Sequence, residues 1–172
     1  MASIEDILKK AKPRERTVMV CTRGDLAGEA ERLAAELAQV SEDWQPADLT
    51  EVHPARKLAE RLQAVRTEAR AAEVPFTLRY IGDRAYSDLL AEHPSKDEGQ
   101  LFDPDTFPRA LVVAACVDPV MDAKQARALF EVLNQGEIQK LVTAAWDVHT
   151  SSDLVPFSLA ASALLAGLGG ES

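Results

Sequence analysis

Two segments with heptad-like spacing constrain the fold of this chain most strongly. In each of them apolar residues recur at intervals of three and four, the spacing that places side chains on one face of a helix. The first segment carries Leu26, Ala30, Leu33, Leu37, Val40 and Trp44, and the second carries Leu58, Leu62, Val65, Ala69 and Ala72. A short connection with Pro46 and Pro54 separates them, so an antiparallel helical hairpin is the simplest arrangement.

The charges of the two segments support this pairing. The predicted first helix is acidic and the second is basic, so opposite charges would face each other across the hairpin. The acidic residues are Glu29, Glu31, Glu36, Glu42 and Asp43, and the basic residues are Arg56, Lys57, Arg61, Arg66 and Arg70.

Short apolar runs on either side of the hairpin predict β-strands. Thr17–Cys21 is rich in β-branched residues, and Phe76–Ile81 alternates apolar with polar side chains. A hairpin returns the second run beside the first, which predicts a two-stranded antiparallel ribbon at the base of a protruding helical arm. Two strands are only marginally stable alone, so we expect the ribbon to pack on the rest of the chain.

The rest of the chain predicts a helical bundle. We expect helices from Asp83 to Glu92, from a cap at Asp105 or Thr106 to Val117, from a cap at Asp122 to a stop at Asn134–Gly136, from Glu137 to Val148, and from about Val155 to Leu168. A polar turn, 149–153, would precede the last one. The predicted fold class is therefore mainly α (α+β).

Four parts follow along the sequence. Residues 1–16 form a short helix, opened by Ser3 as N-cap, and a basic linker. Residues 17–82 hold the two strands and the helical arm, 83–168 form the bundle, and 169–172 are a tail.

Composition and charge narrow the function classes. A net charge of −9 argues against binding nucleic acid or an anionic membrane through charge alone. The longest apolar run, Leu154–Leu168, is short for a membrane span, and the first 16 residues lack the apolar core of a secretory signal. Two cysteines make no disulfide framework. We therefore expect an intracellular protein.

Motifs for catalysis or metal binding are scarce. The three histidines lack metal-ligand spacing, and no phosphate-binding glycine loop or GxSxG motif is present. The best enzymatic candidate is Cys116 with His93 and Asp118, yet a free cysteine in the apolar stretch AACV is more typical of a buried residue. His93 is better explained as the cap of a helix end, where its imidazole can meet unpaired carbonyls. Trp146 is either an interface anchor or a core or half-buried residue.

Four phrases occur in an order that resembles one known family. They are AYSDLLAEHP (Ala85–Pro94), FPRALVVAACVDP (Phe107–Pro119), LFEVLNQGEIQKLVTAAWDV (Leu129–Val148) and VPFSLAAS (Val155–Ser162). This order is similar to that of the tail assembly chaperones of long-tailed actinobacterial phages and prophages. A weaker likeness extends to Thr17–Leu37. The likeness covers about half of the chain, which departs from the family pattern at Tyr80–Arg84 and Ser95–Gln100.

The resemblance implies a non-catalytic helical protein without a cofactor. Its partners would be the tape measure protein and the tail tube protein, and it would act in the cytoplasm of the bacterial host and be absent from the finished virion. The residues that we expect to contact the client are Phe107, Leu111, Val155, Phe157 and Leu164. The segment 154–168, which contains the last three of these residues, is either the last core helix or an apolar face for a partner helix.

Two other functions remain open at this point. One is a structural virion component, an adaptor or minor tail protein whose arm docks between subunits. The remote one is a small thiol enzyme that uses Cys116. Self-association is also open, because the helical seams could close within one chain or between two copies.

Overall fold

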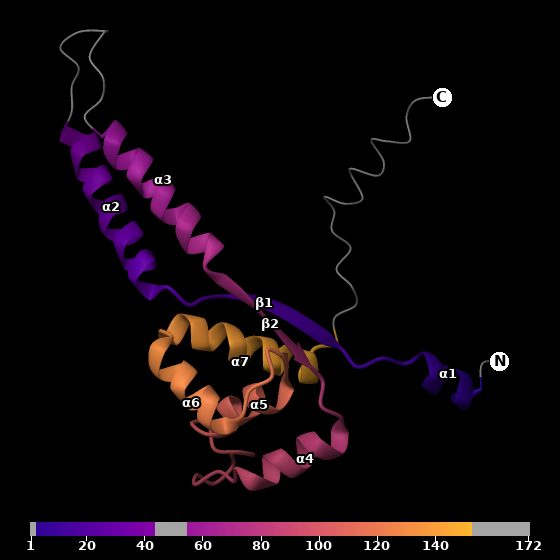
Figure 1. The fold of residues 1–172 in the computed structure, drawn as a ribbon. Helices are drawn as coiled ribbons and strands as arrows, with labels where there is room; N and C mark the ends of the chain where they lie inside the picture. The colour runs from indigo at the N-terminus through magenta and orange to yellow at the C-terminus, as the bar shows by residue number, and fades with distance from the viewer. Residues whose placement is uncertain (1–2, 44–54, 153–172) are drawn as a thin grey trace, which may run out of the picture.

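The computed structural model describes residues 3–43 and 55–152. This part is mainly helical with a small antiparallel sheet, so the predicted α+β class is confirmed (Figure 1). Its elements are α1 (Ile4–Lys10), β1 (Glu15–Cys21), α2 (Gly24–Asp43), α3 (Arg56–Ala71), β2 (Glu73–Arg79), α4 (Asp83–Glu92), α5 (Phe107–Ala115), β3 (Cys116–Asp118), α6 (Ala123–Val132) and α7 (Gln135–Thr150).

The predicted helical hairpin is present. α2 and α3 pack side by side and project from the body of the molecule (Figure 1). Their seam buries Leu26, Leu33, Leu62 and Val65, with Ala30, Ala34, Leu37, Leu58 and Ala69 packed around them. Arg61 pairs with Glu29 across the hairpin (Nη2–Oε1 2.6 Å), as the charge pattern predicts.

The predicted antiparallel ribbon at the base of the arm is confirmed and has one more strand. β1 pairs with β2 from Glu15 opposite Arg79 to Cys21 opposite Glu73, so both strands begin before their predicted starts. β3 then pairs with β2 on the other side. The prediction of a helix to Val117 is therefore wrong. The chain leaves the helix at Cys116, whose ψ of 115° is extended, and the residue before Pro119 is disfavoured in a helix.

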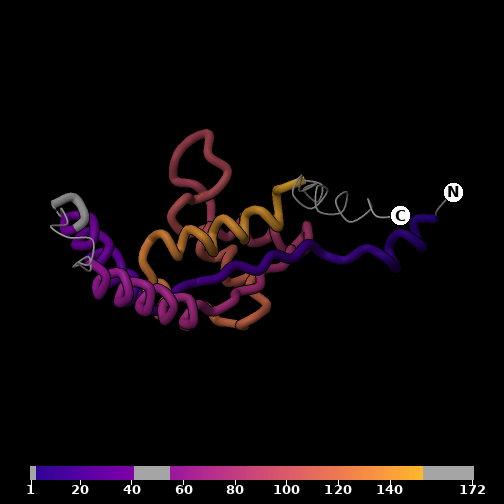
Figure 2. Tube along the Cα trace, turned by 90° about the horizontal axis from the view of Figure 1, so that it is seen from above, coloured from indigo at the N-terminus to yellow at the C-terminus, as the bar shows by residue number. Residues whose placement is uncertain are grey.

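One face of the sheet carries the core. Val20 on β1 and Phe76 and Leu78 on β2 are buried against α5 and α7. Alternation along a strand points the intervening residues to the opposite, uncovered face, where the hydroxyls of Thr17 and Thr77 lie 2.9 Å apart. Figure 2 shows α7 running along β1.

Side-chain caps set the helix boundaries in the bundle. Asp122 and Gln125 form a capping box at the start of α6. Asn134 then caps α7 by accepting from the Glu137 N–H, so Gly136 lies inside α7 and does not stop α6. α7 also continues to Thr150, which corrects the predicted turn at 149–153.

The entry to α5 differs from the prediction. Thr106 occupies the N-cap position without a capping side-chain bond. The carboxylate of Asp103 instead accepts from the Asp105 N–H at 2.9 Å, and the Asp103 N–H donates to the His93 carbonyl at 2.8 Å. These two bonds close the loop between α4 and α5.

α1 stands apart from the body. Ser3 caps it as predicted, accepting from the Asp6 N–H. It buries no residue, and it lies beyond the N-terminal end of β1, at the opposite end of the molecule from the hairpin (Figures 1 and 2).

Some predictions fall outside the described residues: the connection with Pro46 and Pro54, Trp44 in the first seam, and the final helix to Leu168. Among the helices described, none has the length and apolarity that a membrane crossing requires.

Candidate functional site

An apolar groove between α4, α5 and α6 is the best candidate for a binding site. Its volume is about 580 Å³. The floor and walls are formed by Leu89, Ala110, Val113, Ala114, Ala123, Ala126 and Phe130. Several of these residues are alanines, so the backbone of an incoming helix could approach closely.

The groove exists because α5 has two apolar faces. Phe107, Leu111 and Ala115 lie on the face that is buried in the core. Ala110 and Ala114 follow Phe107 and Leu111 at intervals of three, so they lie beside this face, and Val113 lies farther round the helix; all three line the groove. One face holds the bundle together and the other remains available to a partner.

Charged side chains of both signs rim the groove. Arg109 and Arg127 come from α5 and α6, while Glu92 and Asp105 come from the end of α4 and the approach to α5. The guanidinium of Arg109 lies 5.5 Å from the centre of the Phe130 ring, a cation–π distance. The lining of the groove therefore carries charges of both signs.

His93 joins two walls of the groove. It is the C-cap residue of α4, as predicted, and its backbone N–H donates to the Leu90 carbonyl. Its imidazole does not bond to the helix carbonyls as expected. Nδ1 is paired with the Thr106 hydroxyl at 3.0 Å, which ties the end of α4 to the start of α5.

Two of the expected client-contact residues lie in the core. Phe107 and Leu111 are 0% and 1% exposed. The Phe107 ring packs against Tyr86, Phe102 and Trp146, with ring centroids 4.7 to 6.5 Å apart. Both residues therefore pack the core of the described fold, and their contact with a client stays a prediction. Trp146 is half-buried beside Phe102 and Phe107, which agrees with one of its two predicted placements.

The other three expected contact residues, Val155, Phe157 and Leu164, lie outside the described residues. The groove residues themselves were not singled out by sequence. The signal that could have found them is the second apolar stripe of α5, at Ala110, Val113 and Ala114.

The proposed nucleophile is held as a buried thiol. Cys116 lies at the start of β3, and its Sγ donates to the Pro119 carbonyl at 3.2 Å. Burial raises the pKa of this thiol, whereas a thiolate nucleophile needs a lowered pKa. No hydrogen bond joins it to His93, whose Nδ1 is engaged by Thr106.

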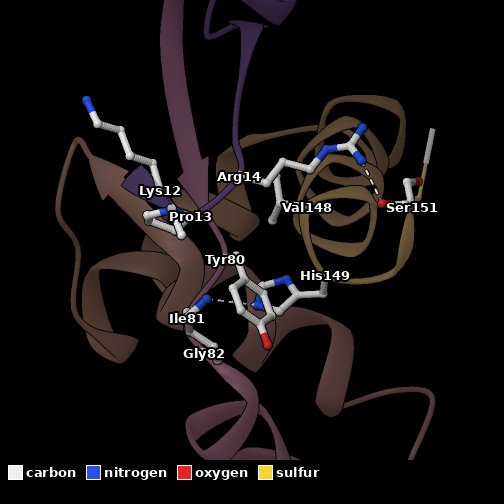
Figure 3. A pocket seen from close by; sticks show the side chains of 10 residues that line it. Lys12, Pro13, Arg14, Tyr80, Ile81, Gly82, Val148, His149 and Ser151 are labelled. Carbon is white, nitrogen blue, oxygen red and sulfur yellow. Dashed lines mark hydrogen bonds between the residues drawn. The ribbon is translucent and has the colours of Figure 1, made fainter. Parts of the chain in front are cut away.

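A second cavity, of about 670 Å³, lies where β1, β2 and α7 meet (Figure 3). His149 is its central side chain. Nδ1 lies 2.7 Å from the Ala145 carbonyl and Nε2 accepts from the Ile81 N–H at 3.2 Å, which assigns the ring proton to Nδ1. The ring packs between Tyr80 and Tyr86, each 5.2 Å away.

The residues of this second cavity connect α7 to the sheet. Arg14 at its edge donates to the Ser151 carbonyl at 2.6 Å, and its own carbonyl accepts from the Tyr80 N–H at 2.9 Å. These contacts and those of His149 fasten α7 to the ends of β1 and β2. The His149 imidazole and the Arg14 guanidinium are both engaged within the chain, so the α4–α5–α6 groove is the stronger candidate.

Within residues 3–43 and 55–152, no group of three or more His, Cys, Asp and Glu side chains is placed to hold a metal ion. Comparison with protein-family models, with curated proteins and with solved structures finds no match for this chain.

Proposed function

We propose that this protein is a non-catalytic chaperone of phage tail assembly that binds the tape measure protein. The sequence supports this through the four ordered phrases that resemble tail assembly chaperones. The single structural observation that carries the proposal is the helix-lined apolar groove of α4, α5 and α6.

A long helical client exposes apolar surface. Such a chain carries apolar stripes that aggregate unless they are covered. An amphipathic helix can lay its apolar face into a groove, where anchor residues at helical spacing fill the floor. The Ala- and Val-lined floor and the mixed charges of the rim suit such a helix better than they suit a small polar substrate.

The partners and place of action belong to the same proposal. The protein would bind the tape measure protein in the host cytoplasm, help to recruit tail tube subunits and leave before the virion is complete. The net charge of −9 would keep the unloaded protein from binding phage DNA while tails are being built.

Co-expression with the tape measure protein of the same phage tests this proposal. Wild-type protein should keep the client in the soluble fraction and co-purify with it. Val113→Asp places a charge on the groove floor and should reduce co-purification at least tenfold. Val132→Asp is the matched control, because Val132 is 74% exposed on α6 and does not line the groove.

Both variants must retain the wild-type circular dichroism spectrum for the comparison to count. If the client stays insoluble with wild-type protein, or if Val113→Asp and Val132→Asp retain it equally, the groove is not the client site.

A structural virion role has one observation in its favour, the arm of α2 and α3 that projects from the body (Figure 1). Such an arm could dock between subunits of a tail. Quantitative mass spectrometry of purified virions separates the two functions. A fixed copy number in the particle would favour the structural component, and absence would favour the chaperone.

A further inference from the structure

α1 presents an apolar face that nothing in the described chain covers. Ile4, Ile7 and Leu8 recur at intervals of three and four residues and are 67%, 51% and 66% exposed. A seven-residue helix is marginal in water unless its apolar face is packed on something. α1 therefore has the features of a helix that packs on another protein surface.

The α4–α5–α6 groove has the complementary shape and chemistry. It is apolar, lined by helices, and floored by small residues such as Ala110 and Ala114. The three apolar side chains of α1 have the spacing with which a docked helix fills such a floor.

The charges of α1 also match the rim of the groove. Its first turn is acidic, with Glu5 and Asp6, and its last turn is basic, with Lys9 and Lys10. The lining of the groove also carries both signs, with Arg109 and Arg127 from α5 and α6 and Glu92 and Asp105 from the end of α4 and the approach to α5. Each charged turn of α1 therefore has residues of opposite sign available in the lining of the groove.

The geometry of the linker argues against docking in the same chain. Arg14 is held in place by Tyr80 and Ser151, so α1 hangs from this anchor by residues 11–13 alone. Three residues span about 10 Å when extended, at 3.3–3.6 Å each. Figure 1 shows α1 on the side of the body away from α6, which forms one wall of the groove.

We propose that two copies of this protein associate by exchanging α1, each placing Ile4, Ile7 and Leu8 in the α4–α5–α6 groove of the other. The exchange is reciprocal, so the assembly closes as a dimer. Because α1 is short, each contact is small and the dimer dissociates in the micromolar range or above. The inference concerns the purified protein alone and does not depend on the identity of any client.

Analytical ultracentrifugation over a concentration series tests the exchange. Wild-type protein should show a monomer–dimer equilibrium. The α1 variant Ile7→Asp with Leu8→Asp should weaken dimerisation at least tenfold, and so should the groove variant Val113→Asp. The control is Leu101→Asp with Val132→Asp, which changes two exposed apolar residues outside both surfaces and should dimerise as the wild type does.

A mixture of the two defective proteins gives the sharper result. The α1 variant keeps an intact groove, and the groove variant keeps an intact α1. Each alone should be monomeric, whereas their mixture should form a 1:1 heterodimer through one remaining contact. If Val113→Asp does not fold, the double variant Arg109→Glu with Arg127→Glu replaces it. This variant reverses the two positive charges of the groove lining and leaves its apolar residues unchanged.

Three results would overturn the proposal. The wild type could remain monomeric over the whole series, the α1 variant could dimerise like the control, or the mixture could remain monomeric while both proteins are folded. A monomer whose groove amides become exposed to hydrogen exchange in the α1 variant would show instead that α1 covers the groove of its own chain.

Discussion

At the scale of single residues, Phe107 shows how a core residue and a contact residue look alike in sequence. Phe107 and Val113 are both apolar residues on the amphipathic helix α5. The fold separates them, since Phe107 is fully buried among Tyr86, Phe102 and Trp146 while Val113 lines the groove. Burial therefore separates the core residues of α5 from those that line the groove, where we propose that a partner binds.

The variant Phe107→Ala tests this assignment. Removing a fully buried aromatic ring leaves a cavity and should lower the free energy of unfolding by about 3–5 kcal/mol, measured by urea denaturation. Val113→Ala serves as the control and should cost much less, because its side chain is only half-buried. A Phe107→Ala protein of wild-type stability that no longer binds the client would return Phe107 to the contact surface.

His149 is the second residue whose surroundings carry a clear consequence. Burial lowers the pKa of its imidazole below the ordinary value of 6.5. The Ile81 N–H points at Nε2, so a proton on that nitrogen would leave two donors facing each other. The folded state therefore favours the neutral ring.

This preference predicts a loss of stability in mild acid. The unfolded chain takes up the proton near pH 6.5 and the folded chain does so only at lower pH. The stabilising effect of the neutral ring is therefore complete above pH 6.5 and is lost as the pH falls from there towards the folded pKa. His149→Gln removes this titration, so its free energy of unfolding should fall less than that of the wild type between pH 7 and pH 5. Equal slopes in urea denaturation would show that His149 does not titrate as described.

At the scale of elements, the hairpin and the body have separate cores. Leu26, Leu33, Leu62 and Val65 form one cluster between α2 and α3, and a second cluster joins the sheet to α5, α6 and α7. β1 and β2 continue directly into the two helices and connect the clusters. The arm can therefore open without dismantling the body.

Leu33→Ala tests this independence by hydrogen exchange. Leu33 is 1% exposed, and its truncation should destabilise the arm by about 2–5 kcal/mol. Amides of α2 and α3 should exchange faster, while those of α5 and α7 keep their protection. Leu101→Ala, at an 81% exposed site, should change neither set. An equal loss of protection in α5 and α7 would mean that the arm and the body unfold together.

The elements of the fold differ in how far the sequence could predict them. The hairpin was predictable, since its seam repeats over several turns and the strands at its base then have to meet. β3 was not, because three residues carry no periodic signal and their pairing with β2 depends on tertiary contact. The groove was not predictable either, because α4, α5 and α6 form it only after they pack.

At the scale of the whole molecule, three features lie apart from one another. The hairpin arm projects at one end, α1 extends at the other, and the body lies between them (Figure 2). The groove belongs to the body. If α1 of a second copy and a helical client use the same groove, they compete for it. Loading of a client would then release the dimer, and the free protein would keep its apolar groove covered until a client arrives.

The central claim is that the α4–α5–α6 groove binds an apolar helix of the tape measure protein. The most direct measurement is a titration of the isotope-labelled protein with a helical fragment of that client, followed by NMR chemical shifts of the backbone amides. The account predicts shifts concentrated at Leu89, Ala110, Val113 and Phe130, and their loss in Val113→Asp but not in Val132→Asp. Shifts confined to the hairpin arm, or no shifts with a soluble helical fragment, would contradict it.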